Sequence, residues 1–312
     1  MSGRFCFMTF EITILGCGAA APTGKHNPSA QVVNVHDKLF LVDCGEGTQL
    51  QLRKFKIRFQ RINHVFISHL HGDHYLGLMG FISSMHLLGR KSKLYIFGPP
   101  DLKEIIDIQL RASQTFLEYP IEFHPTSFDE KRMIFEDRSM SVYSFPLKHR
   151  IDCCGFQFVE KEKRPKVRRE LAKHYDLQPS HIVALKKGLS ITLDSGEVLQ
   201  SADICDPADG VRKYSYCSDT AFSEKVIQAV KNSDLIYHES TFLDSESARA
   251  KTTFHSTARQ AAKVAKLSES KALLIGHFSS RYANDEDFKT EALQEFHKVM
   301  LADEGAIFKV EY

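Results

Sequence analysis

Six consecutive residues of the 312-residue chain read HLHGDH and bring three imidazoles and one carboxylate together. Imidazole nitrogens and carboxylate oxygens are ligands of zinc and of similar divalent metals. The apolar run 64–68 directly before the motif predicts a strand, and in the loop after it His69 and His71 can point to one side. Asp73 and His74 can then turn toward a second position. Because one metal could not take all four ligands without severe strain, the motif predicts a site for two metals.

Three further candidate ligands follow apolar runs elsewhere in the chain. VYSFPLKH ends at His149, YSYCSD ends at Asp219, and ALLIGH ends at His277. Strand-like runs that meet polar sequence in this way suit ligands that gather at one rim of a sheet. Taken one at a time, each of the three residues is equally consistent with a purely structural role.

Two short patterns near Asp219 supply candidate acid–base groups. HEST (238–241) ends a strand-like run, and HST (255–257) opens a helical one. His255 could cap its helix or act as a general acid. Glu239 could orient that imidazole or simply make a structural hydrogen bond. The spacing alone leaves both choices open.

The composition excludes several classes of protein. Hydrophobic residues make up 43% of the chain and charged residues 26%, which are ordinary globular values and rule out disorder. With 41 basic and 39 acidic side chains, the formal net charge is +2, so the chain as a whole is no basic nucleic-acid coat. No window approaches the ~18 apolar residues of a membrane span, and the N-terminal run lacks a cleavage site. The seven cysteines form no CxxC pair, so we expect a soluble, cytoplasmic protein without a membrane partner.

The elements that must position these residues alternate between strand and helix patterns, which predicts an α/β fold with sheets covered by helices. Further strands are expected at 10–15, 31–35, 38–43, 94–97, 142–145, 155–159, 214–217, 235–238, 272–275 and 307–310. Helices are expected at 102–112, 166–174, 223–231, 257–267 and 287–301. The stretch 161–170, KEKRPKVRRE, holds six basic and two acidic residues. It is either a solvated helix face or part of an inserted arm with a binding function.

The Gly-rich run GCGAAA at 16–21 fits a loose dinucleotide-binding pattern, G-x-G-x-x-A. That pattern must open a helix directly after the glycines, whereas a loop bracketed by Pro22 and Pro28 follows here. We therefore expect no nucleotide cofactor and interpret the run as a turn near the rim of the active site.

The order of these motifs resembles that of the ribonuclease Z family within the metallo-β-lactamase superfamily. The motifs that carry the resemblance span nearly the whole chain: LVDCGEGTQLQL (41–52), ISHLHGDHYLGLMG (67–80), PLKH (146–149), SDT (218–220), HEST, HST and HFSSRY (277–282). The resemblance implies one αββα-sandwich domain over 1–312, with an inserted flexible arm at approximately 160–190 that binds tRNA, and a homodimer. Lys186 and Lys187 lie in a run similar to the basic motif of the family arm. With Arg281 beside the active site, they are the expected RNA contacts.

The metal ligands that the resemblance implies form two groups joined by one carboxylate: His69, His71 and His149 for one zinc, Asp73, His74 and His277 for the other, and Asp219 between them. Mn²⁺ or Fe²⁺ could replace Zn²⁺. The implied reaction removes the 3′ trailer from tRNA precursors, with a metal-activated bridging hydroxide as nucleophile. Asp73, His255 and Glu239 are the implied catalytic residues. The products would be a 3′-hydroxyl on the tRNA and a 5′-phosphate on the trailer.

Two other functions compete with this interpretation. The first is another dinuclear hydrolase on the same fold, of phosphodiesterase, thioesterase or arylsulfatase type, which HxHxDH alone does not exclude. The second is a non-catalytic RNA-binding scaffold on a decayed hydrolase fold. Such decay would remove metal ligands, and because all seven candidates are present we favour an enzyme.

Overall fold

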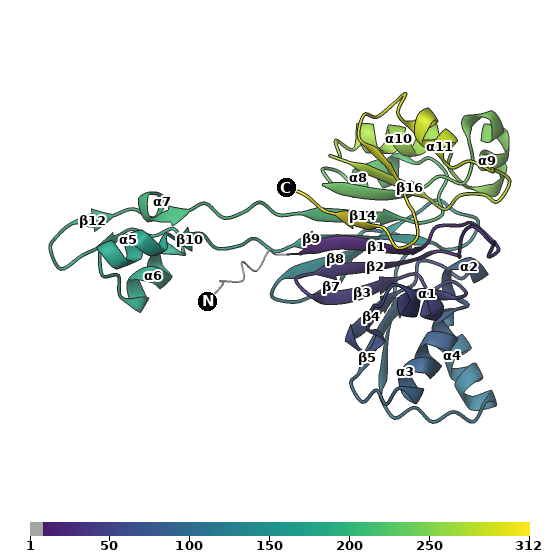
Figure 1. Ribbon diagram of the computed structural model, residues 1–312, viewed down its shortest axis with the longest axis horizontal. Helices are drawn as coiled ribbons and strands as arrows, with labels where there is room; N and C mark the ends of the chain where they lie inside the picture. The colour runs from purple at the N-terminus through teal and green to yellow at the C-terminus, as the bar shows by residue number, and fades with distance from the viewer. Residues whose placement is uncertain (1–8) are drawn as a thin grey trace. The chain divides into compact units, whose positions relative to one another are not determined.

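The computed structural model describes residues 9–312, which fall into two compact units (Figure 1). The first unit comprises the described residues up to Val159 together with Lys213–Glu311, and the second comprises Glu160–Arg212 and Tyr312. Residues 1–8, on which part of the N-terminal expectation rests, lie outside the described residues. Within residues 9–312, no helix is both long enough and apolar enough to cross a bilayer.

The first sheet of the larger unit has seven strands in the order β18-β1-β2-β3-β4-β5-β6. Their bounds are Phe10–Gly16 (β1), Ala30–Val35 (β2), Lys38–Val42 (β3), Ile62–Phe66 (β4), Leu94–Gly98 (β5), Ile121–Pro125 (β6) and Ile307–Lys309 (β18). Strands β3 to β6 run parallel, so each step between them needs a crossover connection. Helices in these crossovers cover the outer face of the sheet: α1 (Thr48–Lys54), α3 (Leu78–Leu87) and α4 (Asp101–Ala112) (Figure 1).

The second sheet also has seven strands, in the order β17-β16-β15-β14-β9-β8-β7. Their bounds are Arg132–Glu136 (β7), Met140–Pro146 (β8), Cys154–Glu160 (β9), Lys213–Cys217 (β14), Leu235–Glu239 (β15), Leu273–Gly276 (β16) and Val299–Leu301 (β17). Strands β14 to β17 run parallel, and β9 pairs antiparallel with β14. The helices on its outer side are α8 (Glu224–Ala229), α10 (Ala258–Leu267) and α11 (Glu286–Ala292) (Figure 1).

Aromatic side chains fill the space between the two sheets. The ring of Phe66 on β4 lies 5.4 Å from that of Phe156 and 5.6 Å from that of Phe158, both on β9. Phe40 on β3 lies 5.7 Å from Phe158. Burying such rings removes large apolar surfaces from water and holds the sheets face to face. The layers run helix, sheet, sheet, helix, which confirms the expected α/β class and αββα sandwich.

The second unit has an apolar core of its own, made of Leu177, Leu185, Ile191, Leu199, Ile204 and Cys205. Its elements are β10 (Lys166–Val167), α5 (Arg169–His174), α6 (Pro179–Leu185), β11 (Ile191–Thr192), β12 (Val198–Leu199), α7 (Ser201–Ile204) and β13 (Cys205–Asp206). The unit ends at Arg212 rather than near residue 190, because β13 pairs back onto β10. The Arg212 guanidinium makes two hydrogen bonds to the buried Glu160 carboxylate, of 2.9 and 2.7 Å.

Two expected helices differ from the structure. The helix expected at 287–301 ends as α11 at Ala292, and Val299–Leu301 form the edge strand β17 instead. A strand of three residues has no periodicity of its own, and only its pairing with β16 defines it. The helix expected at 166–174 begins at Arg169, because the two residues of β10 pair with β13.

Candidate metal centre

The candidate ligands share one feature, because each lies beyond the carboxyl end of a strand. They are His69, His71, Asp73 and His74 after β4, His149 after β8, Asp219 after β14 and His277 after β16. Asp73 and His74 belong to the short helix α2 (Gly72–Tyr75), which begins directly after His71. The structure therefore brings all seven together as the strand-end interpretation predicts.

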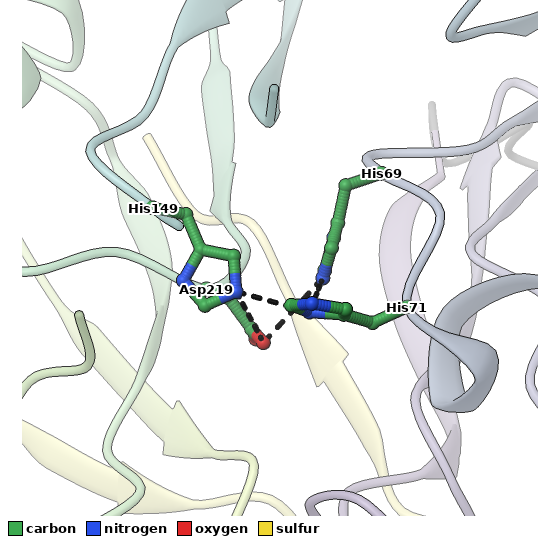
Figure 2. A group of neighbouring side chains, drawn as sticks. All are labelled: His69, His71, His149 and Asp219. Atoms are coloured by element: carbon green, nitrogen blue, oxygen red, sulfur yellow. Dashed lines mark hydrogen bonds and ion pairs between the residues drawn. The ribbon is translucent and has the colours of Figure 1, made fainter. Parts of the chain in front are cut away.

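The first group consists of His69, His71, His149 and Asp219 (Figure 2). His71 Nδ1 lies 3.1 Å from His69 Nε2 and 3.0 Å from His149 Nε2. Asp219 Oδ2 lies 3.5 Å from His69 Nε2 and 3.7 Å from His149 Nε2. Burial, reinforced by the charge of a neighbouring imidazole, lowers the pKa of His69 and of His71 to about 4. Both rings are therefore neutral near pH 7, which is the form that binds metals.

The second group consists of Asp73, His74 and His277, and Asp219 reaches it as well. His277 Nε2 lies 3.3 Å from Asp73 Oδ2 and 3.2 Å from Asp219 Oδ1. His74 Nε2 lies 3.5 Å from Asp73 Oδ2 and 3.4 Å from Asp219 Oδ1. Burial opposes the charge on Asp73, yet His74 and His277 hold the pKa of that carboxyl well below its usual range. Asp219 thus turns one oxygen toward each group, the position of a bridging ligand.

The residues present fit divalent metal ions. Two buried atoms of the cluster, His74 Nε2 and Asp219 Oδ1, have no hydrogen-bond partner among the described residues. Buried polar atoms without a partner are costly, and a cation between them would supply the missing interaction. Imidazole nitrogens with carboxylate oxygens are a donor set that suits zinc and neighbouring transition metals. The structure therefore contains His/Asp clusters that can bind metal.

A buried carboxylate, Asp43 at the end of β3, orients two of the imidazoles. It accepts hydrogen bonds from Ser68 N–H (2.8 Å), Ser68 Oγ (2.9 Å), His74 Nδ1 (2.8 Å) and Tyr216 Oη (2.7 Å). Since Ser68 donates its only hydroxyl proton to Asp43, it must accept from His69 Nδ1, 2.9 Å away. These hydrogen bonds hold the rings of His69 and His74 with Nε2 toward the cluster. Groups that bond to the other ring nitrogen of a metal-binding histidine commonly orient it in this way. Asp43 belongs to the DCGEGTQ run, and the sequence alone indicates no role for it in the site.

His149 and His277 are oriented in a similar way. His149 Nδ1 donates to the Phe254 carbonyl at 3.0 Å, and His277 Nδ1 lies 2.9 Å from Thr241 Oγ1. In both rings Nε2 is left facing the cluster. Thr241 is the last residue of the HEST pattern, but neither its role nor that of Phe254 follows from the sequence, because these contacts join segments far apart in the chain.

The pair expected beside the metals, His255 and Glu239, is in direct contact. His255 Nδ1 lies 3.0 Å from Glu239 Oε1, and Glu239 also accepts from the backbone N–H groups of Thr220 and Ser256. Burial opposes the imidazolium, but the charges of Glu239 and Asp219 raise the pKa of His255 to about 9. The N-cap of α10 is Thr257, which forms a capping box with Gln260, and His255 is not the cap. The helix-cap alternative for His255 is therefore wrong, whereas Glu239 both orients His255 and makes structural hydrogen bonds.

A cavity of about 610 Å³ opens over the cluster and is lined by His71, Asp73, Asp219, His255 and His277, among others. Three arginines also line it: Arg150, directly after His149, Arg249 on α9 (Ser247–Thr253), and Arg281. Arg281 was expected there. Arg150 and Arg249 were not, and only the position of Arg150 next to a ligand could have suggested it.

The remaining expected contacts lie elsewhere. Lys186 and Lys187 follow α6 in the second unit, where Lys187 is exposed and Lys186 half-buried.

Comparisons with known proteins agree with this fold. A family model described as "Anti-Pycsar protein Apyc1" matches residues 10–151. YhfI of Bacillus subtilis, a metallo-β-lactamase fold protein, has a TM-score of 0.68 at 17% identity, covering 96% of this chain and 98% of that one. The αββα sandwich with its metal-ligand cluster thus defines a protein of the metallo-β-lactamase fold.

Closer relatives narrow this class. The short form of human tRNase Z has a TM-score of 0.71 at 27% identity. The match covers 97% of this chain and 100% of the human chain. Ribonuclease Z of Parabacteroides distasonis is 45% identical over 296 residues, which are 95% of this chain and 97% of that protein. The chain belongs to the ribonuclease Z family.

The hydrogen bonds of Asp43 generate a testable prediction. Asp43→Asn should weaken zinc binding by about 10- to 100-fold, because the amide carries no charge and cannot accept from all of its present donors. Competition against a chromophoric chelator measures this affinity. Asp107→Asn, at an exposed position on α4, is the matched control and should bind zinc as the unaltered protein does. Equal affinities for the two variants would contradict the orienting role of Asp43.

Proposed function

We propose that this chain is a zinc-dependent endoribonuclease that acts in the cytoplasm and removes the 3′ trailer from tRNA precursors. The observation that carries the proposal is Asp219, which turns one oxygen toward each of two metal-ligand groups, with His255 and Glu239 beside it. Membership of the ribonuclease Z family supports the choice of RNA as substrate. Small esters, the substrates of other hydrolases on this fold, are the rival choice.

In this proposal the metal ions lie in the two ligand groups. His69, His71 and His149 hold one ion, Asp73, His74 and His277 hold the other, and Asp219 lies between them. Zn²⁺ is preferred on donor chemistry, and Mn²⁺ or Fe²⁺ are possible substitutes. When bound, such a metal pair acidifies a water nucleophile and stabilises charge on the phosphoryl oxygens. Asp73 also accepts a hydrogen bond from the backbone N–H of Ala20, at 2.7 Å, which fixes its carboxylate.

His255 is the proposed general acid. Its Nδ1 is held by Glu239, so the opposite ring nitrogen carries the proton that can be given away. Because its pKa is raised to about 9, His255 holds that proton at neutral pH. Transfer to the departing 3′-oxygen would leave a 3′-hydroxyl on the tRNA and a 5′-phosphate on the trailer. Glu239 acts as a positioning residue that keeps the imidazolium aimed at the cavity.

Positive charge on the chain would hold the RNA. Arg281 lines the cavity and is the proposed contact for a phosphate next to the scissile bond. The second unit, Glu160–Arg212, is the proposed tRNA-binding arm, and Lys186 and Lys187 are its proposed phosphate contacts.

We further propose that the protein is a homodimer. The support is the family resemblance together with apolar side chains that the described chain leaves in solvent, Leu50 on α1 and Leu87 and Leu88 at the end of α3. Analytical ultracentrifugation of the purified protein reports the mass directly, and a monomer at micromolar concentration would contradict the proposal.

The proposed reaction is tested with a tRNA precursor that carries a labelled 3′ trailer. The metal-loaded protein should make one discrete cut directly after the discriminator nucleotide, and removal of metal by a chelator should abolish the cut. Restoring zinc should restore it. Retained metal and turnover of small esters without any RNA cleavage would replace the substrate with that of another hydrolase on this fold.

The role of His255 predicts both a rate and a pH profile. His255→Ala should keep its metal content but lose about 10²-fold or more in turnover, because the leaving oxygen lacks a proton donor. In the unaltered protein burial opposes the imidazolium, but the charge of Glu239 raises the pKa of His255, so the acid is protonated below that raised pKa and lost above it. Turnover should therefore fall as the pH rises into the alkaline range, and the variant should lack this alkaline fall. An unchanged rate in the variant would exclude the general-acid role.

The arm can be tested by deletion, because Val159 on β9 pairs with Lys213 on β14 and a short Gly/Ser turn can join the two strands. This variant should bind precursor tRNA more weakly but hydrolyse bis(p-nitrophenyl) phosphate as before. A milder variant, Lys186→Ala with Lys187→Ala, should reduce the salt dependence of tRNA binding by about one unit of slope per lysine. Lys103→Ala on α4 is the control. Equal loss on both substrates after deletion would show that the arm is needed for the fold.

A further inference from the structure

A second cluster of metal-ligating side chains lies outside the metal centre described above, which we call the HLHGDH centre (the HLHGDH residues with His149, Asp219 and His277). It shares no residue with that centre. It consists of Cys17 in the Gly-rich run, His26 in the loop before β2, and Glu304 in the loop before β18. We propose that Cys17, His26 and Glu304 form a structural site for one zinc ion. None of the three has a part in the proposed reaction, so the site is independent of that proposal.

The distances within the cluster suit a tetrahedral ion. One candidate ligand atom from each residue lies within 4.8 Å of the other two, and Cys17 Sγ lies 3.4 Å from His26 Nδ1. Zn–S and Zn–N bonds of about 2.3 and 2.0 Å place neighbouring tetrahedral ligands roughly 3.5 Å apart. The Ala302 carbonyl oxygen, 3.6 Å from Cys17 Sγ, is available for the fourth position. A thiolate, an imidazole and a carboxylate are ligands that zinc accepts in proteins.

The partners of His26 and Glu304 leave a coordination position open on each. His26 Nε2 lies 2.9 Å from Asp285 Oδ2, so that its Nδ1 faces Cys17, an arrangement common among zinc-bound histidines. The Glu304 carboxylate accepts from Asn27 N–H, from Asn27 Nδ2 at 2.8 Å and from Gln51 Nε2 at 2.5 Å. A carboxylate offers about four lone-pair sites, so one remains for a metal.

The local charge also favours a dication. The carboxylates of Asp285, Asp303 and Glu304 all act on the buried Cys17 sulfur, and Lys25 is the cation beside them, 2.8 Å from Asp285. Three carboxylates against one ammonium group leave an excess of negative charge, which a bound Zn²⁺ would offset. Without the metal, the same atoms would form only a hydrogen-bonded chain from Cys17 through His26 to Asp285.

A metal here would stiffen one wall of the cavity. The loop between Cys17 and His26 contributes Ala19, Ala20 and Pro22 to the cavity lining. An ion that joins both ends of this loop to the segment before β18 would hold it in place.

Cobalt provides a direct test, because Co²⁺ bound by a thiolate shows a sulfur-to-metal charge-transfer band in the near ultraviolet. The ligand groups of the HLHGDH centre contain only nitrogen and oxygen donors and cannot give this band. The full-length protein, stripped of metal and titrated with Co²⁺ alone, should develop the band. Cys17→Ser should abolish it and bind one zinc fewer per chain by elemental analysis.

Cys205→Ser is the matched control, because Cys205 is also buried but belongs to the second unit and to none of the candidate ligand groups. It should keep the band and the full zinc content. A native protein that binds Co²⁺ without the band, or a band that survives in Cys17→Ser, would overturn the site. His26→Gln should weaken the Co²⁺ affinity measured from the growth of this band by at least tenfold. Because none of these measurements uses RNA, failure of the proposed endonuclease activity would leave the result unaffected.

Discussion

The carboxylate of Asp43 is the group on which the geometry of the metal centre depends. A charge buried without partners costs several kcal/mol, and Asp43 avoids this cost through donors on two different sheets. Ser68 and His74 reach it from the HLHGDH segment of the first sheet, and Tyr216 reaches it from β14 of the second. One buried charge therefore fixes an imidazole in each ligand group and also links the sheets at the edge where those groups lie.

The same edge holds backbone conformations that are unfavourable for residues with a side chain. Asp43 (φ 54°), Phe254 (φ 58°) and His277 (φ 61°) are all in the left-handed region. Each such residue costs on the order of 1 kcal/mol or more, and it persists only where surrounding contacts over-determine it. Here those contacts include the hydrogen bonds of the Asp43 carboxylate, of the Phe254 carbonyl and of the His277 ring. Burial of the aromatic core and the hydrogen bonds between the parallel strands offset the energy of this strain.

The sequence predicted those parts of the site that local pattern encodes. HLHGDH follows a recognisable strand, and His149, Asp219 and His277 each end an apolar run, so the strand-end argument and the family resemblance lead to the same seven residues. Asp43, Arg249 and the Cys17–His26–Glu304 cluster could not be found in this way. Their roles depend on contacts between segments as far apart as Cys17 and Ala302, which no short motif records.

The fold could be predicted to the same extent. Long strands with apolar runs were located within a residue or two, and the sandwich follows from their alternation with helices. The edge strands β6 and β7, the three-residue strand β17 and the extent of the second unit were not. These elements are partly exposed or short, and they are defined by pairing with distant partners rather than by their own periodicity.

The point at which the second unit enters the chain has a consequence for evolution. Its ends leave from Val159 and return to Lys213, two residues that are already neighbours in the β9–β14 ladder. The entropy of closing a loop grows only slowly with its length, so an insertion here imposes little penalty on the sandwich. The unit also carries its own apolar core. Lineages can therefore lengthen, shorten or exchange it as a module without rebuilding the sheet edge that holds the metal-ligand groups.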